Sequence, residues 1–324
     1  MKRFKNILYV NESTADQASA IARAAVLAEN HQADLTILDV IPPEASSVDV
    51  GLHSGDAIST GLQADMADNR RSTLESLLQD YLKKPGIQQA ERVGKTYLEV
   101  IRAVLRNAYD LVIKPAENPA WTHRLFGSDD LHLLRKCPCP VWLMKPPEKP
   151  NYSSIVAAVD LGTQDPFSSD DDLNREILEL AASLALSDFA SLHIVHAWEA
   201  FGETTLLSRG SGSLEGITDY VDKKREHHRN GLQRLAEDLR GWIGADLYDY
   251  LAPTFHLPKG PARKVIAPLA AELEADLVVM GTVARTGISG LIIGNTAETI
   301  LDQLASSVLA VKPPGFKTPV KMDA

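Results

Sequence analysis

The sequence predicts an α/β protein built as two tandem open parallel sheets, each with five strands and with helices on both faces. Three observations lead to this fold class. Short apolar runs rich in valine, isoleucine and leucine recur along the chain, amphipathic segments of helical length separate them, and the whole succession occurs twice. Strands that alternate with helices are typical of right-handed βαβ units, whose strands lie parallel.

The strand candidates form matched pairs between the two halves of the chain. The pairs are 7–11 with 156–160, 35–40 with 192–197, 110–114 with 276–280, and 141–147 with 308–314. Each segment is short and apolar, as expected for strands that are buried on both faces of a parallel sheet. In the first pair, this alignment places Asn11 opposite Asp160.

Helical patterns fill the intervals between the strand candidates. They cover 15–29, 62–82, 97–108, 217–242 and 262–273. Loops are expected over 42–61 and 202–216, after the second strand of each copy, where they would border the ligand crevice of an open α/β sheet. Gly94-Lys95-Thr96 predicts a turn into a helix and not a P-loop, because that motif needs a glycine at position 89, which is Gln89.

Composition excludes several classes of protein. The 324 residues include 33 Lys and Arg against 43 Asp and Glu, a net charge of −10, so we expect neither nucleic acid nor an anionic membrane as a partner. The N-terminal apolar run is too short for a signal peptide, and no segment is long enough to span a bilayer, which predicts a cytoplasmic protein. Two cysteines do not make a disulfide framework.

The segment from Gly281 to Glu298 carries the most specific pattern. It resembles the phosphate-binding segment of the universal stress protein family, which reads Gly, two residues, Gly, nine residues, Gly and then Ser or Thr. Those places hold Gly281, Ala284, Gly294 and Asn295 here, so the first and third glycines match. The resemblance implies the adenine nucleotide alpha hydrolase-like fold, and the tandem arrangement is most similar to members of the E type.

The internal repeat predicts domains at 1–147 and 152–314, joined through a short proline-rich linker over 146–151, and a tail at 315–324. The resemblance implies an intrachain pseudo-dimer in which 141–145 pairs with 308–312; a homodimer stays open. It implies ATP as the candidate ligand of the second domain and leaves Mg²⁺ open. The implied nucleotide-binding residues are Asp160, Ala197, Gly281, Ala284, Arg285, Gly294, Asn295 and Thr296. Physical chemistry supports an anion here, because a helix that begins near Gly294 presents free N–H groups, with Asn295 as N-cap. Ala284 and Asn295 depart from the pattern and should weaken ATP binding.

The first copy departs much further from the same pattern. Lys114, Glu117, Gly127 and Ser128 hold the equivalent positions, and Asn11 replaces the carboxylate of the first strand. Glu117 would bring negative charge toward a phosphate. The first domain is therefore expected to have no ATP site, so that it is structural or holds a different ligand.

No catalytic constellation is apparent, so we expect no enzyme, or at most slow ATP hydrolysis. No metal site is expected either: Cys137 and Cys139 lack further ligands, and His193 and His196 lie three apart on a strand and face opposite ways. His227 and His228 are assigned to a solvated helix face. The predicted function is a stress-response, ligand-binding protein with weak ATP binding. The alternatives are a module for a nucleotide conjugate or an apolar ligand, and an interaction protein with vestigial sites.

Overall fold

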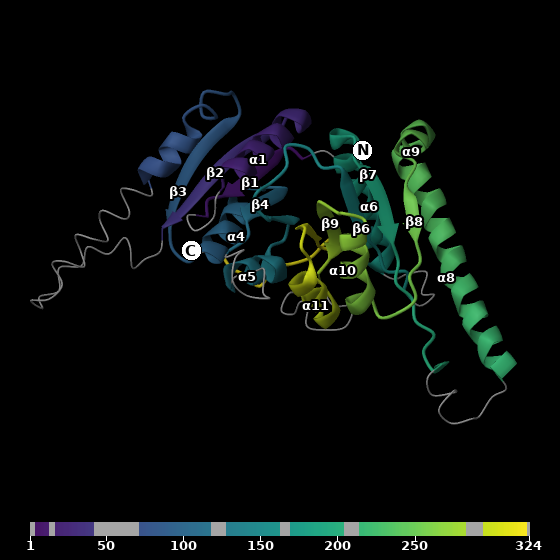
Figure 1. The fold of residues 1–324 in the computed structure, drawn as a ribbon. Helices are drawn as coiled ribbons and strands as arrows, with labels where there is room; N and C mark the ends of the chain where they lie inside the picture. The colour runs from purple at the N-terminus through teal and green to yellow at the C-terminus, as the bar shows by residue number, and fades with distance from the viewer. Residues whose placement is uncertain are drawn as a thin grey trace, which may run out of the picture. The chain divides into compact units, whose positions relative to one another are not determined.

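The computed structural model describes residues 4–12, 17–41, 71–117, 128–162, 169–203, 214–282 and 294–322 (Figure 1). The chain forms two compact units, which part between Pro150 and Asn151, inside the proline-rich segment that was predicted as a linker. The expected loop over 42–61, and the central part of the one over 202–216, lie outside the described residues.

The first domain has a parallel sheet in the order β3-β2-β1-β4-β5. Its elements are β1 (Asn6–Val10), α1 (Ala18–His31), β2 (Asp34–Ile41), a helix over 71–78, β3 (Ile87–Val93), α4 (Thr96–Asn107), β4 (Leu111–Pro115), α5 (Ser128–Lys136) and β5 (Val141–Met144).

The second domain repeats this topology in the order β8-β7-β6-β9-β10, again with parallel pairs. Its elements are β6 (Ser154–Ala158), α6 (Ser169–Asp188), β7 (Ser191–Val195), α8 (Leu214–Ile243), α9 (Ala245–Leu251), β8 (Thr254–His256), α10 (Ala262–Glu272), β9 (Leu277–Gly281), α11 (Asn295–Gln303) and β10 (Ser307–Val311). The predicted fold class is confirmed.

In each sheet, an aspartate accepts hydrogen bonds from the backbone at the start of the first strand. Asp110 accepts backbone N–H groups of Lys5 and Asn6 at 2.7 and 3.1 Å, and Asp276 accepts those of Ser153 and Ser154 at the same two distances. In both domains the aspartate directly precedes the fourth strand, so it fixes that strand beside the first. Strands β4 and β10 are buried along their whole length, as their largely apolar sequences predict.

The third strand of each copy has no apolar run. β3 (IQQAERV) is largely exposed, and β8 has only three residues, because both lie at the edge of a sheet. A glycine with positive φ follows each of them: a Cβ on Gly94 would come within 2.7 Å of Glu99 Cγ, and one on Gly260 within 2.9 Å of Val265 Cγ1. The prediction of a turn at Gly94 is confirmed, and Gly260 makes a similar turn before α10 in the second domain.

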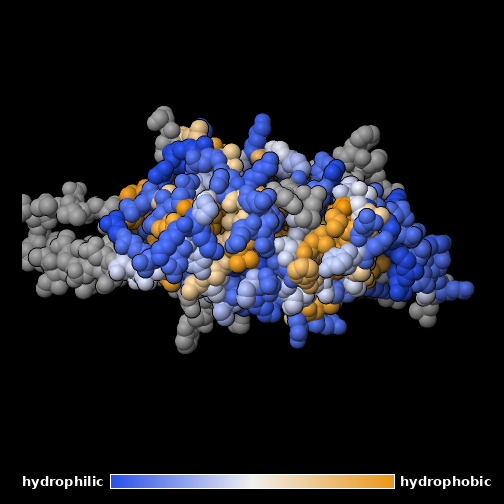
Figure 2. Space-filling view, turned by 90° about the horizontal axis from the view of Figure 1, so that it is seen from above, coloured by the Kyte–Doolittle hydropathy of each residue, from blue (hydrophilic) through white to orange (hydrophobic). Residues whose placement is uncertain are grey.

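Helix α9 was not predicted. Arg240 in α8 donates two hydrogen bonds to the Asp249 carboxylate in α9, at 2.8 and 3.0 Å, which ties the two helices together. The 30 residues of α8 are polar on much of their surface, and no helix within the described ranges is long and apolar enough to cross a membrane. Hydrophilic residues cover most of the face seen in Figure 2, between smaller hydrophobic patches.

Candidate functional site

Each sheet has one point where the chain connections change direction, between β1 and β4 in the first domain and between β6 and β9 in the second. In an open α/β sheet, the crevice at the carboxyl ends of these strands is the usual ligand site. Glu12 and Asp160 lie just after β1 and β6, and Gly281 ends β9. The candidate residues of the two copies can therefore be compared at this edge.

The strand registers establish which residues of the two copies correspond. The backbone N–H of Asn11 donates to β2 over 2.8 Å, and that of Val159 donates to the same position of β7 over 3.0 Å. Asn11 therefore corresponds to Val159, and Glu12 corresponds to Asp160. The sequence alignment that paired Asn11 with Asp160 is wrong by one residue. Short apolar runs such as Leu-Tyr-Val and Ala-Ala-Val match equally well when one of them is shifted by one residue.

A second pairing is corrected in the same way. β4 and β9 each have five residues, and both begin opposite the same position of the neighbouring strand. Lys114 is therefore the counterpart of Met280, and Pro115, not Lys114, takes the place of Gly281. In the helices that follow, α5 begins at Ser128 and α11 at Asn295, as the sequence alignment had paired them.

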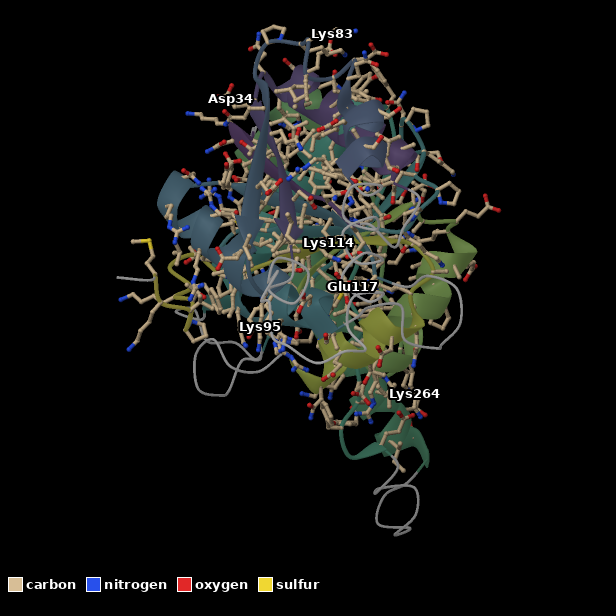
Figure 3. All side chains as sticks on the ribbon, turned by 90° about the vertical axis from the view of Figure 1, so that its left-hand side faces the viewer. Asp34, Lys83, Lys95, Lys114, Glu117 and Lys264 are labelled. Atoms are coloured by element: carbon tan, nitrogen blue, oxygen red, sulfur yellow. The ribbon has the colours of Figure 1, made fainter. Side chains whose placement is uncertain are left out.

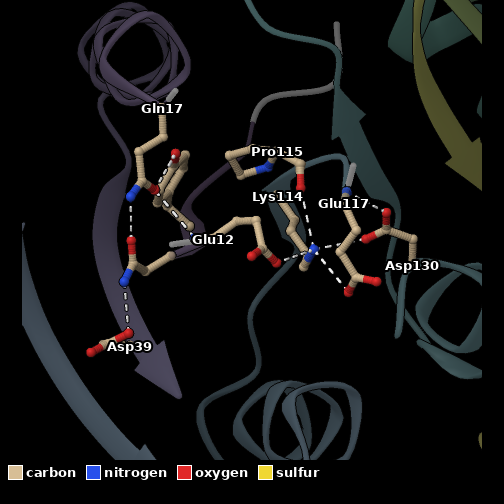
Figure 4. Close-up of polar contacts among 9 residues, drawn as sticks. Glu12, Gln17, Asp39, Lys114, Pro115, Glu117 and Asp130 are labelled. Carbon is tan, nitrogen blue, oxygen red and sulfur yellow. Dashed lines mark hydrogen bonds and ion pairs between the residues drawn. The ribbon is translucent and has the colours of Figure 1, made fainter. Parts of the chain in front are cut away.

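A buried lysine fills the edge of the first domain (Figure 4). The Lys114 ammonium lies 2.8 Å from Asp130 Oδ1, 2.9 Å from Glu12 Oε2 and 3.3 Å from Glu117 Oε1, and it also donates to the carbonyl oxygen of Pro115 at 3.2 Å. We call Lys114, Glu12, Glu117 and Asp130 the Lys114 cluster. The side chains of Lys114 and Asp130 are fully buried. Figure 3 shows the contrast with Lys83 and Lys95, which project from the surface.

The charges of the Lys114 cluster shift each other's pKa values. Burial alone would lower the pKa of Lys114, but Asp130, Glu12 and Glu117 together outweigh it and raise that pKa above its ordinary value. Burial raises the pKa of Glu117 to about 7, with Asp130 and Glu12 adding to the rise and Lys114 opposing it. Three carboxylates thus share one ammonium group. Glu117, the most exposed of the three acids, is therefore still partly protonated at neutral pH.

A second polar chain closes the same edge toward α1. Gln17 Nε2 donates to Asn11 Oδ1 at 2.5 Å, and Asn11 Nδ2 donates to Asp39 Oδ1 at 2.7 Å. All three residues are buried. The side chains of these three residues therefore hydrogen-bond to one another within the domain.

The second domain presents an exposed carboxylate at the corresponding place. Asp160 is exposed, while its backbone N–H and carbonyl groups bond to the buried Asn174 of α6, at 3.1 and 2.8 Å. Ala197, two residues beyond β7, is half-buried. Met280 and Ala297 stand where the first domain has Lys114 and Asp130, so the buried ion pair of the first domain has two apolar counterparts here.

Two histidines beside Asp160 were not predicted as part of this edge. His196 is buried after β7, and its Nε2 lies 2.9 Å from Nδ1 of His228 in α8. The His228 ring also lies 5.7 Å from the Trp198 ring. The assignment of His228 to a solvated helix face is therefore wrong: its ring is half-buried, because α8 packs against the residues that follow β6 and β7.

The electrostatic setting of His228 includes the candidate carboxylate. Burial lowers the pKa of His228, His227 and Lys224 lower it further, and Asp160 opposes this. Gly231, three residues further along α8, lets the helix lie close to this edge, since a Cβ there would be only 3.2 Å from Leu161 Cδ1. Helix α8 thus packs against the residues next to Asp160.

The glycine that ends β9 lies close to a neighbouring helix. A Cβ on Gly281 would lie 2.8 Å from Cδ2 of Leu173 in α6. The structure thus gives this glycine of the family pattern a place in the packing of α6 on the sheet. Thr282 follows it and is buried, and Lys312 at the end of β10 donates to the Thr282 hydroxyl at 2.5 Å.

The start of α11 faces the same end of the sheet. Gly294 N–H donates to the carbonyl oxygen of Thr282 at 3.2 Å, so the end of β9 and the beginning of α11 are held together. Gly294 is the N-cap residue, and Asn295, predicted as N-cap, is the first helical residue. Asn295 and Thr296 are both exposed. The other candidates, Ala284 and Arg285, lie outside the described residues, as does Gly127 of the first copy.

The Universal stress protein family profile matches the chain twice, over residues 3–145 and 151–312. The chain belongs to the universal stress protein family. It is 27% identical over 329 residues to universal stress protein E of Escherichia coli K12, covering 100% of this chain and 98% of that protein. It is 28% identical over 323 residues to a universal stress protein E homolog of Haemophilus influenzae, covering 96% and 98% of the two chains.

Solved structures agree with this assignment of the tandem universal stress protein. A functionally unknown protein from Pseudomonas aeruginosa PAO1 is 27% identical with a TM-score of 0.67, covering 96% of this chain and 93% of that chain. A universal stress protein from Archaeoglobus fulgidus DSM 4304, 16% identical, has a TM-score of 0.59 over 95% and 98% of the chains, and it shows the same fold.

One pattern in the sequence could have predicted the Lys114 cluster. A lysine within the apolar run Leu-Val-Ile-Lys-Pro lies in a buried strand, and a buried ammonium needs a carboxylate partner. Glu12, after β1, and Asp130, in the first turn of α5, were the available partners in this universal stress protein. Which acidic residues reach Lys114 depends on the strand register, and the sequence alignment had shifted that register by one residue.

Proposed function

We propose that this tandem universal stress protein is a ligand-binding protein of the stress response, in which the second domain binds an adenine nucleotide weakly and the first domain binds none. The observation that carries the proposal is the contrast at the switch-point edge. In the first domain, Lys114 and Asp130 form a buried ion pair there, and in the second domain the same positions hold Met280 and Ala297.

The edge of the second domain has groups suited to both ends of a nucleotide. The exposed carboxylate of Asp160 can accept hydrogen bonds from an amine or a ribose hydroxyl. At the other side, the exposed first turn of α11, from Asn295 and Thr296 onward, offers N–H groups that have no acceptor within the helix, and these favour a phosphate. Arg285 would add positive charge by its place in the sequence pattern.

The first domain offers a poor environment for the same ligand. Glu12, the counterpart of Asp160, is ion-paired with Lys114, so its carboxylate is not available to a ribose without breaking that pair. Glu117 and Asp130 surround the lysine with acidic groups. A phosphate brought to this edge would meet more negative charge than positive charge.

Calorimetric titration of the full chain with ATP tests the proposal. We expect one weak site per chain, which Gly294→Val removes because a branched side chain would fill the phosphate position at the start of α11. The matched control is Gly127→Val at the equivalent place of the first copy, which should leave ATP binding unchanged. Loss of binding in Gly127→Val alone would assign the nucleotide to the first domain and contradict the proposal.

The weakness of the site is a separate part of the proposal. Ala284 stands where the family pattern has glycine, and its methyl group would crowd the phosphate path. Ala284→Gly should therefore tighten ATP binding about fivefold, which corresponds to about 1 kcal/mol. If the unaltered chain binds no adenine nucleotide, and Ala284→Gly does not create binding, the alternative of a different ligand or an interaction role takes its place. Mass spectrometry of natively purified protein would then identify a bound ligand.

A further inference from the structure

The exposed Asp160 side chain extends from a backbone that a buried amide holds at two points. Oδ1 of Asn174, in α6, accepts a hydrogen bond from the Asp160 N–H at 3.1 Å, and Nδ2 of Asn174 donates to the Asp160 carbonyl oxygen at 2.8 Å. Asn174 is buried while Asp160 is exposed, so these two bonds fix the main chain and leave the carboxylate at the surface. One side chain of α6 thus sets the position of the residue that the proposed site uses at its nucleoside end.

The residues on either side of Asp160 are held by a second element. Nδ1 of the buried His196 lies 3.4 Å from the N–H nitrogen of Leu161 and 3.4 Å from the carbonyl oxygen of Val159. Either tautomer of His196 therefore has a backbone partner here, because a protonated Nδ1 donates to the carbonyl and an unprotonated Nδ1 accepts from the N–H. The other ring nitrogen, Nε2, lies 2.9 Å from Nδ1 of His228 in α8. Helices α6 and α8 therefore both restrain this short segment.

The first domain uses a similar amide differently. There, Oε1 of Gln17 accepts the N–H of Glu12, the counterpart of Asp160, at 3.3 Å. The donor end of the same amide turns to the Asn11 side chain, and the Glu12 carboxylate is ion-paired with Lys114. In the second domain both ends of the amide bond to the main chain of the residue whose carboxylate is exposed. The two bonds to the main chain of one residue thus occur in the copy for which a ligand is proposed.

We propose that Asn174 and His196 are positioning residues of the nucleotide site, which fix the backbone around Asp160 so that its carboxylate is an ordered acceptor for the hydroxyl or amino groups of a nucleoside. They act through Asp160 and do not contact the ligand. An acceptor that is already ordered before the ligand arrives loses less conformational freedom on binding, which favours affinity. This role rests on the proposed function, since that function assigns the nucleoside end of the nucleotide to Asp160.

Titration of the full chain with ATP, followed by NMR chemical shifts so that weak binding can be measured, tests this role. Asn174→Ala should weaken ATP binding about three- to tenfold, because the Asp160 carboxylate must then be ordered on binding. His196→Phe should weaken it in the same direction, since it removes the bonds of the ring to the backbone beside Asp160. The matched control is Gln17→Ala, which removes the similar amide of the first domain and should leave ATP affinity unchanged.

A double-variant comparison separates this positioning role from a general structural one. If Asn174 acts through Asp160, Asn174→Ala should cause no further loss of ATP affinity in a chain that already carries Asp160→Ala. An equal loss in both backgrounds, or ATP affinity unchanged in Asn174→Ala, would refute the role and leave the proposed function standing. An unaltered chain that binds no ATP would overturn both.

Circular dichroism establishes that each variant is folded. If Asn174→Ala does not fold, His196→Phe takes its place in the same comparison. If neither variant folds, hydrogen exchange of the unaltered chain decides. The Asp160 N–H should then exchange slowly, because it is bonded to Asn174, and exchange at the rate of an unprotected amide would refute the role.

Discussion

Lys114 in the first domain and Met280 in the second occupy the same place in the same parallel sheet, and the surroundings of each follow from that one difference. The buried ammonium of Lys114 is matched by Asp130, Glu12 and Glu117. Met280 has Ala297 at the position of Asp130, and Asp160, the counterpart of Glu12, is exposed. The charged side chains at the edge of the first domain thus pair with one another, whereas Asp160 and the first residues of α11 are exposed in the second domain.

This comparison teaches that the backbone of the edge does not decide its chemistry. Both domains share strand order, registers, the aspartate that precedes the fourth strand and the glycine turn after the third. The side chains at two or three positions decide whether buried ion pairs form at this edge. The following variants break or sharpen the contrast, and they are given from the largest expected effect to the smallest.

Lys114→Met should have the largest effect, because it gives the first domain the residue of the second while leaving the carboxylates in place. Removing one partner of a buried ion pair costs about 3–5 kcal/mol. We expect the free energy of unfolding, measured by urea denaturation, to fall by about that amount. Lys83→Met, at an exposed lysine 2.9 Å from Asp80, is the control and should change it by less than about 1 kcal/mol.

The double variant Lys114→Met, Asp130→Ala sharpens the same comparison. It copies both apolar residues of the second domain, and replacing a buried ion pair by apolar residues is often close to neutral. We therefore expect it to recover much of the stability that Lys114→Met loses. A double variant as unstable as Lys114→Met would show that Glu12 and Glu117, and not the Asp130 pair, account for the loss.

Gly281→Ala should have the next largest effect. Its Cβ would lie 2.8 Å from Leu173 Cδ2, and overpacking of this kind costs about 1–3 kcal/mol. Leu173→Ala should relieve the clash, so a double-mutant cycle monitored by thermal denaturation should give a favourable coupling energy between the two sites. Additive losses would mean that Gly281 is not required by its contact with Leu173.

Glu117→Gln should have the smallest effect, visible only as a change in pH dependence. The folded-state pKa of about 7 lies above the value of 4.5 for the unfolded chain, so this group stabilises the fold at low pH. That contribution is lost as the pH rises from about 4.5 to 7. With 21% of the side chain exposed, the change is about 1 kcal/mol, well below the full linkage value.

The measurement for Glu117 compares urea unfolding at pH 5 and pH 8. Relative to the unaltered chain, Glu117→Gln should be more stable at pH 8 than at pH 5, since the glutamine cannot acquire a charge. Glu91→Gln, at an exposed residue of β3 paired with Arg71, provides the control and should show no such crossover. Identical pH profiles for Glu117→Gln and the unaltered chain would place the pKa of Glu117 near its ordinary value.

Much of the fold could be predicted from the sequence, for a physical reason. Strands such as β4 and β9 are buried on both faces, so they must be apolar along their length, and the repeat of such runs identifies a duplicated parallel sheet. The edge strands β3 and β8 were not located, because an edge strand needs no continuous apolar run. Helix α9 was missed as well, since it is tied to α8 by an ion pair between side chains nine residues apart.

The sequence by itself determined the duplicated fold, the family, and the absence of a matching glycine pattern in the first copy. Only the tertiary structure decided the register, and with it that Glu12 and not Asn11 stands opposite Asp160, since hydrophobic patterning tolerates a slip of one residue. Tertiary structure also brought Lys114 to Asp130, sixteen residues away, and His193 to His256, sixty-three residues away. Such pairs arise from the folding of separate strands and helices onto one sheet, and no local pattern in the chain encodes their distance.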